Sequence, residues 1–293
     1  MNKNKVVLGI DVGGTRIRVG VVTDNGELLK VITEKTPRDK KEILSKINEM
    51  VKSVIFREVC AIGIGIAGPI DKKSGKIYPP NIKSLTGVNI FKEFKKYNIP
   101  VSIENDSNCF AIAEHKFGTG VGKKNILGIT IGTGIGCGII IDDKLYLGKD
   151  GAAGEVGHII INSDAKGVGR GVKGSFENLA SGTAISRRAK ESGLEETSLE
   201  NLIKIMNKNK KAKTVISETG GYMGVGLASL INIFNPEIIV LGGSVGNCLK
   251  YFRKEVNREI NSRGIMPSKK VKIVTSKLRY PGVLGAGIIA LER

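Results

Sequence analysis

The stretch LGIDVGGTRIRVGVV (residues 8–22) recurs in modified form as LGITIGTGIGCGIII (residues 127–141). Once a one-residue gap is placed in the turn, leucine, glycine, isoleucine and threonine positions of the two copies coincide. Each copy consists of an apolar strand, a Gly/Thr turn and a second apolar strand, which is the pattern of a β-hairpin. The repeat therefore predicts a duplicated domain with a cleft between its two halves.

Composition narrows the class of protein. The chain has 293 residues, of which 41% are hydrophobic and 25% charged, and this suits a soluble protein of two domains. No apolar run approaches the ~20 residues that a membrane helix needs, and the first strand begins too early for a signal peptide. We therefore expect a cytoplasmic protein with no membrane partner. The net charge of +18 suits phosphate-bearing partners, but the lysine-rich segment 203–214 resembles a solvated helical face, so no nucleic-acid partner is expected.

Strands and helices alternate along the rest of the chain, which predicts an α/β fold. We expect domains at 1–115 plus about 276–293 (a smaller N-terminal lobe) and at 116–275 (a larger C-terminal lobe). The pattern predicts helices over 38–56, 175–193, 217–235 and 282–293, and strands over 59–71, 97–103, 237–245 and 269–278.

Two glycine-rich turns are candidates for phosphate binding. They are DVGGT (11–15) and GTG (132–134), one in each copy of the repeat. Glycine lets the backbone turn tightly and present successive N–H groups to an anion. One such turn is usually only a turn, but two in register with threonine hydroxyls favour phosphate binding. The sequence lacks GxxxxGK[ST], which excludes a P-loop enzyme.

A third feature is ENDSN (104–108), which separates the strand YNIPVSI from a segment with helical spacing. The simpler interpretation is that Asn105, Asp106 or Ser107 caps the helix. The alternative is that the Asp106 carboxylate is held there to accept a proton, since a helix N-terminus favours the ionised form. The residues alone leave both open.

Together, these motifs resemble those of the ROK family (repressors, open reading frames and kinases) in the actin-like ATPase and sugar-kinase superfamily. The resemblance covers nearly the whole chain. It implies a two-lobed actin-like (ribonuclease H-like) fold, a homodimer, and an ATP- and Mg²⁺-dependent hexokinase or glucokinase acting on a hexose hydroxyl, with the 6-OH of glucose as the leading candidate. It rests on DVGGTRI (11–17), IAGPID (66–71), PPNI (79–82), ENDSN (104–108), IGTGIGCGI (131–139), GAAGEVGH (151–158), ENLASG (177–182) and LGGSV (241–245).

The resemblance also implies roles for individual residues. Asp106 would be the general base, and Asp11 would lie near Mg²⁺, through water. The sugar-binding positions would be Gly68, Asn81, Asn105, Asp106, Glu155, His158 and Glu177. The phosphate- and nucleotide-binding positions would be Asp11, Gly13, Gly14, Thr15, Arg16, Thr133, Gly134, Gly242, Gly243 and Ser244, with Arg16 standing where the family commonly has lysine.

One departure from the family concerns zinc. Many members follow GEVGH with CxCGxxGCxE, whose three cysteines join a histidine around a structural zinc. The corresponding stretch here is VGRGVKGSFE (168–177), with Val168, Arg170 and Ser175 at the cysteine positions. A site without thiolate ligands has lost most of its coordination, so we expect no structural zinc.

Several alternatives remain. The sugar could be N-acetylmannosamine, N-acetylglucosamine, fructose or allose, and the phosphoryl donor could be polyphosphate. The family also contains sugar-responsive repressors with a helix-turn-helix ahead of the phosphate turn. Few residues precede Asp11 here, so we expect a kinase rather than a repressor. A nucleotide-binding scaffold without phosphoryl transfer is the fallback.

Overall fold

The computed structural model describes residues 5–165 and 172–292. These divide into two compact units. The first contains the described residues up to Val121, Leu147–Ala153 and those from Leu278 onward, and the second contains those of Gly122–Tyr146 and Gly154–Lys277. Within the described residues, no helix combines the length and hydropathy of a membrane span.

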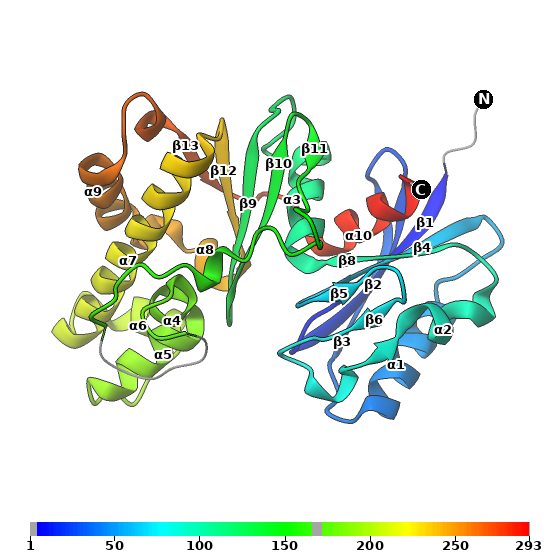
Figure 1. Ribbon diagram of the computed structural model, residues 1–293. Coiled ribbons are helices and arrows are strands. Elements are labelled where there is room, and N and C mark those ends of the chain that lie inside the picture. Colours follow the sequence, from blue (N-terminus) through cyan, green and yellow to red (C-terminus); the bar gives the residue numbers. More distant parts are fainter. Residues whose placement is uncertain (1–4, 166–171, 293) are drawn as a thin grey trace. The chain divides into compact units, whose positions relative to one another are not determined.

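The first unit is built on a five-stranded sheet of order β3-β2-β1-β4-β8, with a small three-stranded sheet, β5-β6-β7, beside it (Figure 1). Its strands are β1 (Val6–Val12), β2 (Arg16–Thr23), β3 (Leu28–Lys35), β4 (Val59–Ile66), β5 (Ile70–Asp71), β6 (Lys76–Ile77), β7 (Val88–Asn89) and β8 (Val101–Asn105). Its helices are α1 (Lys40–Lys52), α2 (Ile90–Phe94), α3 (Asp106–Phe117) and α10 (Pro281–Leu291), with 3₁₀ turns η1 (Lys83–Leu85) and η2 (Lys95–Tyr97).

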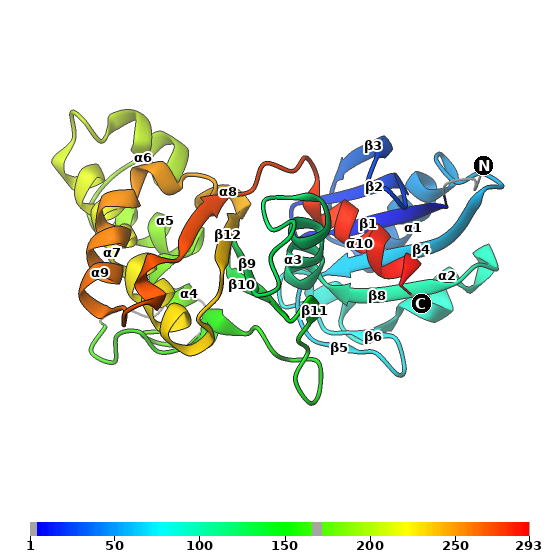
Figure 2. The ribbon, with the colours of Figure 1, turned by 90° about the horizontal axis from the view of Figure 1, so that it is seen from above.

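Helices cover both faces of this sheet, so alternate residues of its strands enter different cores. Leu8 and Ile10 of β1 pack in the core that includes α1, whereas Val7 packs with α3 and α10. Helix α10 lies along β1 and β4, beside α3 (Figure 2). The approach is close because Gly63 has no side chain: a Cβ there would stand 1.6 Å from the carbonyl oxygen of Ala286.

The second unit repeats the topology in a five-stranded sheet of order β11-β10-β9-β12-β13. Its strands are β9 (Ile126–Ile131), β10 (Ile135–Ile141), β11 (Lys144–Leu145), β12 (Ile238–Gly242) and β13 (Lys272–Thr275). Its helices are α4 (Phe176–Ala180), α5 (Gly182–Glu191), α6 (Leu199–Ile205), α7 (Lys210–Phe234), α8 (Gly243–Gly246) and α9 (Arg253–Arg263), with 3₁₀ turns η3 (Val156–His158), η4 (Leu249–Tyr251) and η5 (Ser268–Lys270).

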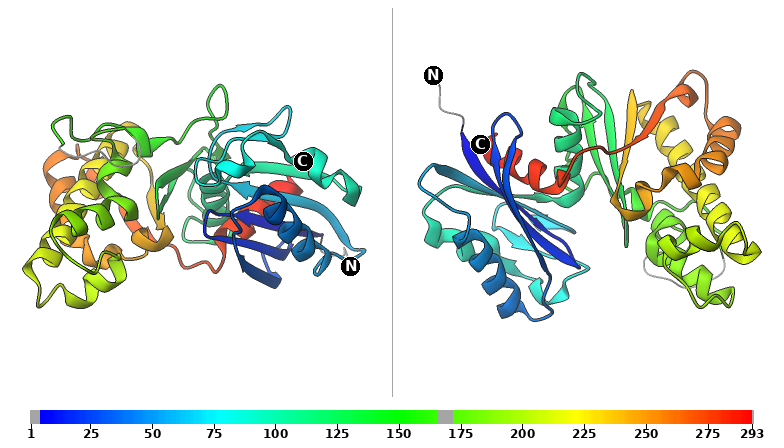
Figure 3. Two further views of the ribbon diagram at one scale, coloured as in Figure 1. Left: turned by 90° about the horizontal axis from the view of Figure 1, so that it is seen from below. Right: turned by 180° about the vertical axis from the view of Figure 1, so that it is seen from behind.

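The helices of the second unit share one large apolar core with its sheet. Leu127 and Ile129 of β9 pack in this core with Phe176 of α4 and Leu227 of α7. Helices α7 and α9 run side by side, and both are visible in yellow and orange in Figure 3. Because the sheet and helices bury each other's apolar sides, this unit has a core of its own.

The predicted duplication of the β-hairpin is confirmed at the level of single residue pairs. In both units the hairpin is antiparallel, and its first strand then pairs in parallel with a later strand. Gly9 stands opposite Gly20 in the first hairpin, and Gly128 stands opposite Gly138 in the second. The sequence repeat is therefore also a repeat of register.

One predicted helix was wrong. Residues 175–193 form two helices, α4 and α5, because Ser181 is extended (ψ 166°). The Ser181 hydroxyl accepts a hydrogen bond from the backbone N–H of Ala184 (3.3 Å), and the N–H of Gly182 donates to the carbonyl of Gly132 (2.7 Å). The break thus caps α5 and attaches its start to the GTG turn.

Candidate active site

The candidate residues of the first unit lie where its parallel strands end. Asp11 of β1 stands beside Gly65 of β4, and Asn105 at the end of β8 stands beside Ile66. The carboxyl ends of parallel strands are where α/β sheets bind ligands. The predicted residues of β1 and β8 are therefore brought to one edge of one sheet.

At this edge, the polar residues of ENDSN at the strand-to-helix corner have different roles. Asn105 is the N-cap of α3, and its side chain accepts hydrogen bonds from the backbone N–H groups of Ser107 (2.9 Å) and Asn108 (3.4 Å). Asp106 is the first residue of the helix, and its Oδ1 also accepts from the Ser107 N–H (2.9 Å). Because Asn105 supplies the cap, the Asp106 carboxylate is not needed for that task.

The Asp106 carboxyl is the group whose pKa suits proton transfer near neutrality. Burial and the nearby negative charge of Asp11 raise its pKa to about 6, and hydrogen bonds from Ser107 oppose the rise. A general base works best when its pKa lies near the working pH. The corner therefore holds a carboxylate that is ionised at pH 7 and still basic enough to accept a proton.

Asp11 carries the other candidate carboxylate of the first unit. Its Oδ2 accepts a hydrogen bond from the Arg18 guanidinium (2.8 Å), and the two residues face each other across the β1–β2 hairpin. Burial raises the pKa of Asp11, and the positive charge of Arg18 lowers it. The guanidinium of Arg18 also lies over the ring of Tyr280. Sequence analysis missed Arg18, although its place opposite Asp11 follows from the hairpin register.

The loop that carries Asn81 lies against the first glycine turn. A Cβ at Gly14 would stand 3.3 Å from the Cβ of Asn81, and one at Gly68 would stand 2.5 Å from the Cδ of Pro80. Gly68 has φ +94°, which also requires glycine. The predicted sugar residues Gly68 and Asn81 therefore belong to one loop system packed on the phosphate turn.

The rest of the first turn is held by its own backbone and by Thr36. The N–H of Gly13 donates to the carbonyl of Arg16 (3.0 Å), the hydroxyl of Thr36 donates to the carbonyl of Gly13 (2.6 Å), and the N–H of Thr36 donates to Thr15 (3.0 Å). Arg16 itself is exposed. The turn is thus held in place, and its glycines have no side chains that could cover their backbone N–H groups.

The candidate residues of the second unit lie around its GTG turn. Glu177 accepts a hydrogen bond from the N–H of Ile135, which follows Gly134, through Oε2 (2.8 Å). The hydroxyl of Thr183 donates to the carbonyl of Thr133 (2.8 Å). Together with the bond from Gly182 to this turn, these contacts brace the GTG turn from the α4–α5 segment.

The GEVGH segment packs on the same place. A Cβ at Gly157 would stand 2.5 Å from the carbonyl oxygen of Ile135 and 3.4 Å from the Cβ of Glu177. The carboxylate of Glu155 lies 3.7 Å from Nε2 of His158, and both side chains are about half exposed. The segment that carries Glu155 and His158 thus packs on Glu177 through Gly157, and the side chains of Glu155 and His158 are accessible to a ligand.

The third predicted element of this unit is LGGSV. Gly242 ends β12 beside Thr130 of β9, and Gly243 has φ +80°. A Cβ at Gly243 would stand 2.4 Å from the carbonyl oxygen of Ile131, so only glycine fits this turn. Gly243 and Ser244 begin the short helix α8 next to the GTG turn.

Two of the positions relevant to zinc, Val168 and Arg170, lie outside the described residues. Ser175, at the third cysteine position, is the N-cap of α4, and its hydroxyl accepts a hydrogen bond from the N–H of Asn178 (3.2 Å). The residue that would be a thiolate ligand in the family therefore has a capping role here. The absence of structural zinc remains a prediction from these substitutions.

Comparison with known proteins also indicates the ROK family. The ROK family matches residues 7–293. The glucokinase of Thermotoga maritima is 30% identical, and the match covers 98% of both chains. The xylose repressor of Caldicellulosiruptor bescii is also 30% identical, over 97% of this chain and 77% of the repressor. A ROK family glucokinase from Streptomyces griseus, solved in complex with glucose and AMPPNP, is 30% identical, with a TM-score of 0.86 over 98% of this chain and 100% of that chain.

Proposed function

We propose that this chain, which belongs to the ROK family, is a sugar kinase that transfers the γ-phosphoryl group of ATP to a hydroxyl group of a hexose. The observation that carries the proposal is the Asp106 carboxylate. Asn105 caps helix α3 in its place, and burial and Asp11 raise the pKa of Asp106 to about 6. The glucokinases among the relatives support a sugar kinase in general terms. Glucose, through its 6-OH, is the acceptor that we infer.

In the proposed reaction, Asp106 acts as the general base. The sugar hydroxyl gives its proton to the Asp106 carboxylate while its oxygen bonds to the γ-phosphorus, and the bond from that phosphorus to the bridging oxygen of ADP breaks. The proton then passes from Asp106 to solvent. Phosphoryl transfer depends mainly on positioning and charge stabilisation, so one well-placed base is sufficient protein chemistry.

The nucleotide would be held by the glycine turns, whose backbone N–H groups suit phosphate oxygens. Mg²⁺ fits the donor set, because this ion prefers oxygen ligands and commonly takes one or two carboxylates with substrate phosphates and water. Asp11 is the residue that would hold it, through water, since Arg18 already occupies its Oδ2. When bound with ATP, the ion would neutralise charge on the phosphates.

The side chains that we infer to bind the sugar are amides, carboxylates and one imidazole. Asn81 and Asn105 belong to the first unit, and Glu155, His158 and Glu177 belong to the second. Hydroxyl-rich ligands are recognised by such groups because an unpaired buried polar group is costly. The resemblance to family kinases that phosphorylate other sugars makes a panel of hexoses and N-acetylhexosamines the appropriate substrate set.

The test is a coupled assay of ADP formation with Mg-ATP and with Mg²⁺-polyphosphate controls, run across that panel. Asp106→Asn should lower kcat by about 10²- to 10⁴-fold, the range for loss of a general base. Asp142→Asn is the matched control, because Asp142 is exposed in a left-handed turn that asparagine tolerates. Equal activity of the two variants would contradict the role of Asp106.

A second function has a specific observation in its favour, namely the match to a xylose repressor. A repressor-type chain would bind sugar without transferring phosphate. Tight calorimetric binding of a sugar, with no ADP formed from any donor, would move the chain to that class.

A further inference from the structure

Glu104, immediately before the N-cap of α3, is a buried carboxylate that none of the predicted roles uses. Its side chain is only 7% exposed. One oxygen, Oε1, accepts hydrogen bonds from the backbone N–H of Asn105 (2.8 Å) and from the side-chain amide of Asn108 (2.9 Å). Both donors flank Asp106. Glu104 therefore fixes the backbone of the corner from which the proposed base projects.

The other oxygen of Glu104 is paired with Lys72. Lys72 lies in the turn of the β5–β6 hairpin, 32 residues before Glu104 in the sequence. In the sequence, this hairpin lies between Gly68 and Asn81, which are two of the predicted sugar residues of the first unit. The ion pair thus connects the loop system that would contact the sugar with the corner that carries the base.

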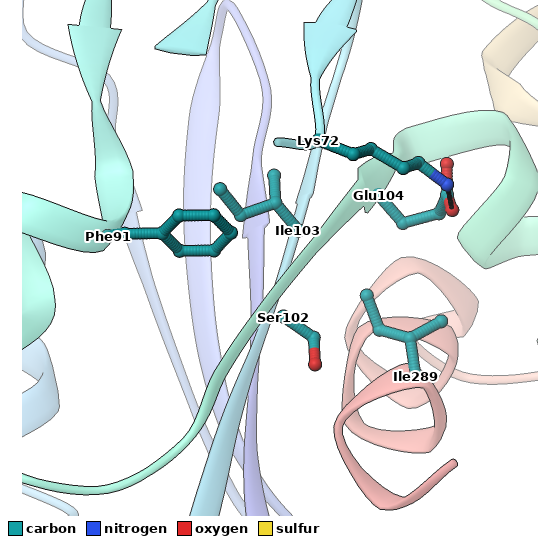
Figure 4. Close-up of a pocket in the computed structure, with 6 residues that line it drawn as sticks. All are labelled: Lys72, Phe91, Ser102, Ile103, Glu104 and Ile289. Atoms are coloured by element: carbon teal, nitrogen blue, oxygen red, sulfur yellow. Dashed lines mark hydrogen bonds and ion pairs between the residues drawn. The ribbon is translucent and has the colours of Figure 1, made fainter. Parts of the chain in front are cut away.

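The strands of the hairpin pack in the same apolar core as β8, through Ile77 and Ile103, but the turn that carries Lys72 borders a cavity. A cavity of about 180 Å³ lies beside the pair, lined by Lys72, Phe91, Ser102, Ile103, Glu104 and Ile289. Figure 4 shows the ammonium group of Lys72 meeting the Glu104 carboxylate at this cavity. The hydroxyl of Ser102 is buried there and has no hydrogen-bond partner among the described residues. Side chains do not fill the space, so at the turn itself the ion pair is the polar contact with β8 among the described residues.

We propose that Lys72 is a positioning residue, which through Glu104 holds the sugar-binding loop system in register with Asp106. The inference rests on the proposed function. A displacement of about 1 Å between substrate and base can cost on the order of 100-fold in rate. Loss of Lys72 should therefore impair use of the sugar more than use of ATP, because part of the proposed ATP contacts come from the second unit, to which this loop system does not belong.

The test compares Lys72→Met with Lys73→Met, measured with glucose and Mg-ATP. Lys73 is exposed in the same turn, and its replacement removes the same charge. For Lys72→Met, we expect kcat/KM for glucose to fall roughly 10- to 100-fold, with the KM for ATP within about twofold of the native value. Lys73→Met should keep both constants. Equal constants for the two variants, or a parallel loss for glucose and ATP, would overturn the inference.

A double-mutant cycle separates positioning from an uncompensated charge. Glu104→Gln keeps an acceptor for the donors at the corner but removes the ion pair. If Lys72 acts through Glu104, Glu104→Gln and the double variant should both show the loss of Lys72→Met, so the effects will not add. Full recovery in the double variant would show that only the unpaired carboxylate matters, and additive losses would show two independent sites; either result refutes the proposal.

These outcomes are distinct from failure of the proposed function. In that case the native chain would turn over no sugar. Calorimetric binding of glucose to Lys72→Met and Lys73→Met would then decide the inference, since a loop system displaced only in Lys72→Met must bind glucose more weakly. Equal binding by the two variants would refute it. Thermal unfolding of each variant verifies that it is folded.

Discussion

The hydrogen bond between Thr183 and the GTG turn predicts that a substitution there will change the KM for ATP and not the KM for glucose. Thr183, near the start of α5, donates its hydroxyl proton to the carbonyl of Thr133 in the turn (2.8 Å). Thr183→Val removes this hydrogen bond and preserves the shape of the side chain. Thr183→Ser is the matched control, because it keeps the hydroxyl and removes only the methyl group.

The magnitude follows from the type of hydrogen bond. A neutral hydrogen bond contributes a net of about 0.5–1.5 kcal/mol. If that free energy serves to hold the turn in its phosphate-binding form, its loss raises the KM for ATP roughly 2- to 12-fold, since about 1.4 kcal/mol corresponds to tenfold. The lower end is expected, because this contact is exposed and water can replace the hydroxyl.

The assay is steady-state ADP formation with ATP varied at saturating glucose, and then with glucose varied at saturating ATP. Thr183→Val should raise the KM for ATP and leave the KM for glucose unchanged, whereas Thr183→Ser should retain native constants. An equal rise in both KM values would refute the assignment of this contact to the phosphate turn. No change in either constant would show that Glu177 and Gly182 hold the turn without Thr183.

Two further predictions concern pH and stability. Burial and Asp11 raise the pKa of Asp106 to about 6, and the base must be ionised to accept a proton. In a pH series at constant ionic strength, kcat/KM for glucose should therefore fall about tenfold per pH unit below that pKa. A flat profile down to about pH 5 would contradict this prediction. In urea unfolding, Gly221→Ala should stabilise the chain by up to about 1 kcal/mol, since the position is helical and a Cβ there meets no atom closer than 3.8 Å. Gly63→Ala should destabilise it by about 3 kcal/mol or more, because α10 leaves no room for a Cβ; similar stabilities for the two variants would contradict the packing.

The sequence predicted the features that depend on local pattern. The alternation of apolar residues and the repeated turn chemistry located both hairpins, and the strand-to-helix change at ENDSN placed Asp106 at the start of a helix. The pairings Arg18–Asp11 and Lys72–Glu104 were missed for different reasons. Arg18 could have been found from hairpin register, whereas Lys72 approaches Glu104 only through the tertiary packing of a separate hairpin.

The break at Ser181 shows a second limit. Residues 175–193 have helical spacing throughout, and serine and glycine in the middle are tolerated in a helix at modest cost. What ends α4 is a contact with the GTG turn, which lies far away in the sequence: the N–H of Gly182 donates to Gly132. A helix boundary set by such a partner cannot be predicted from propensity, and here the partner is the candidate phosphate site.

The two hairpins also show how duplication can be adapted to a polyanionic ligand. In equivalent register, the ion pair of Asp11 and Arg18 in the first hairpin corresponds to Thr130 opposite Gly136 in the second. A carboxylate beside a phosphate chain is repulsive unless a cation lies between them. If ATP binds as proposed, the Asp11 carboxylate of the first hairpin is available to hold Mg²⁺ through water, whereas Thr130 and Gly136 of the second hairpin carry no charge that would repel a phosphate. This difference predicts that Asp11 serves the metal and that Thr130, at the equivalent position of the second hairpin, does not.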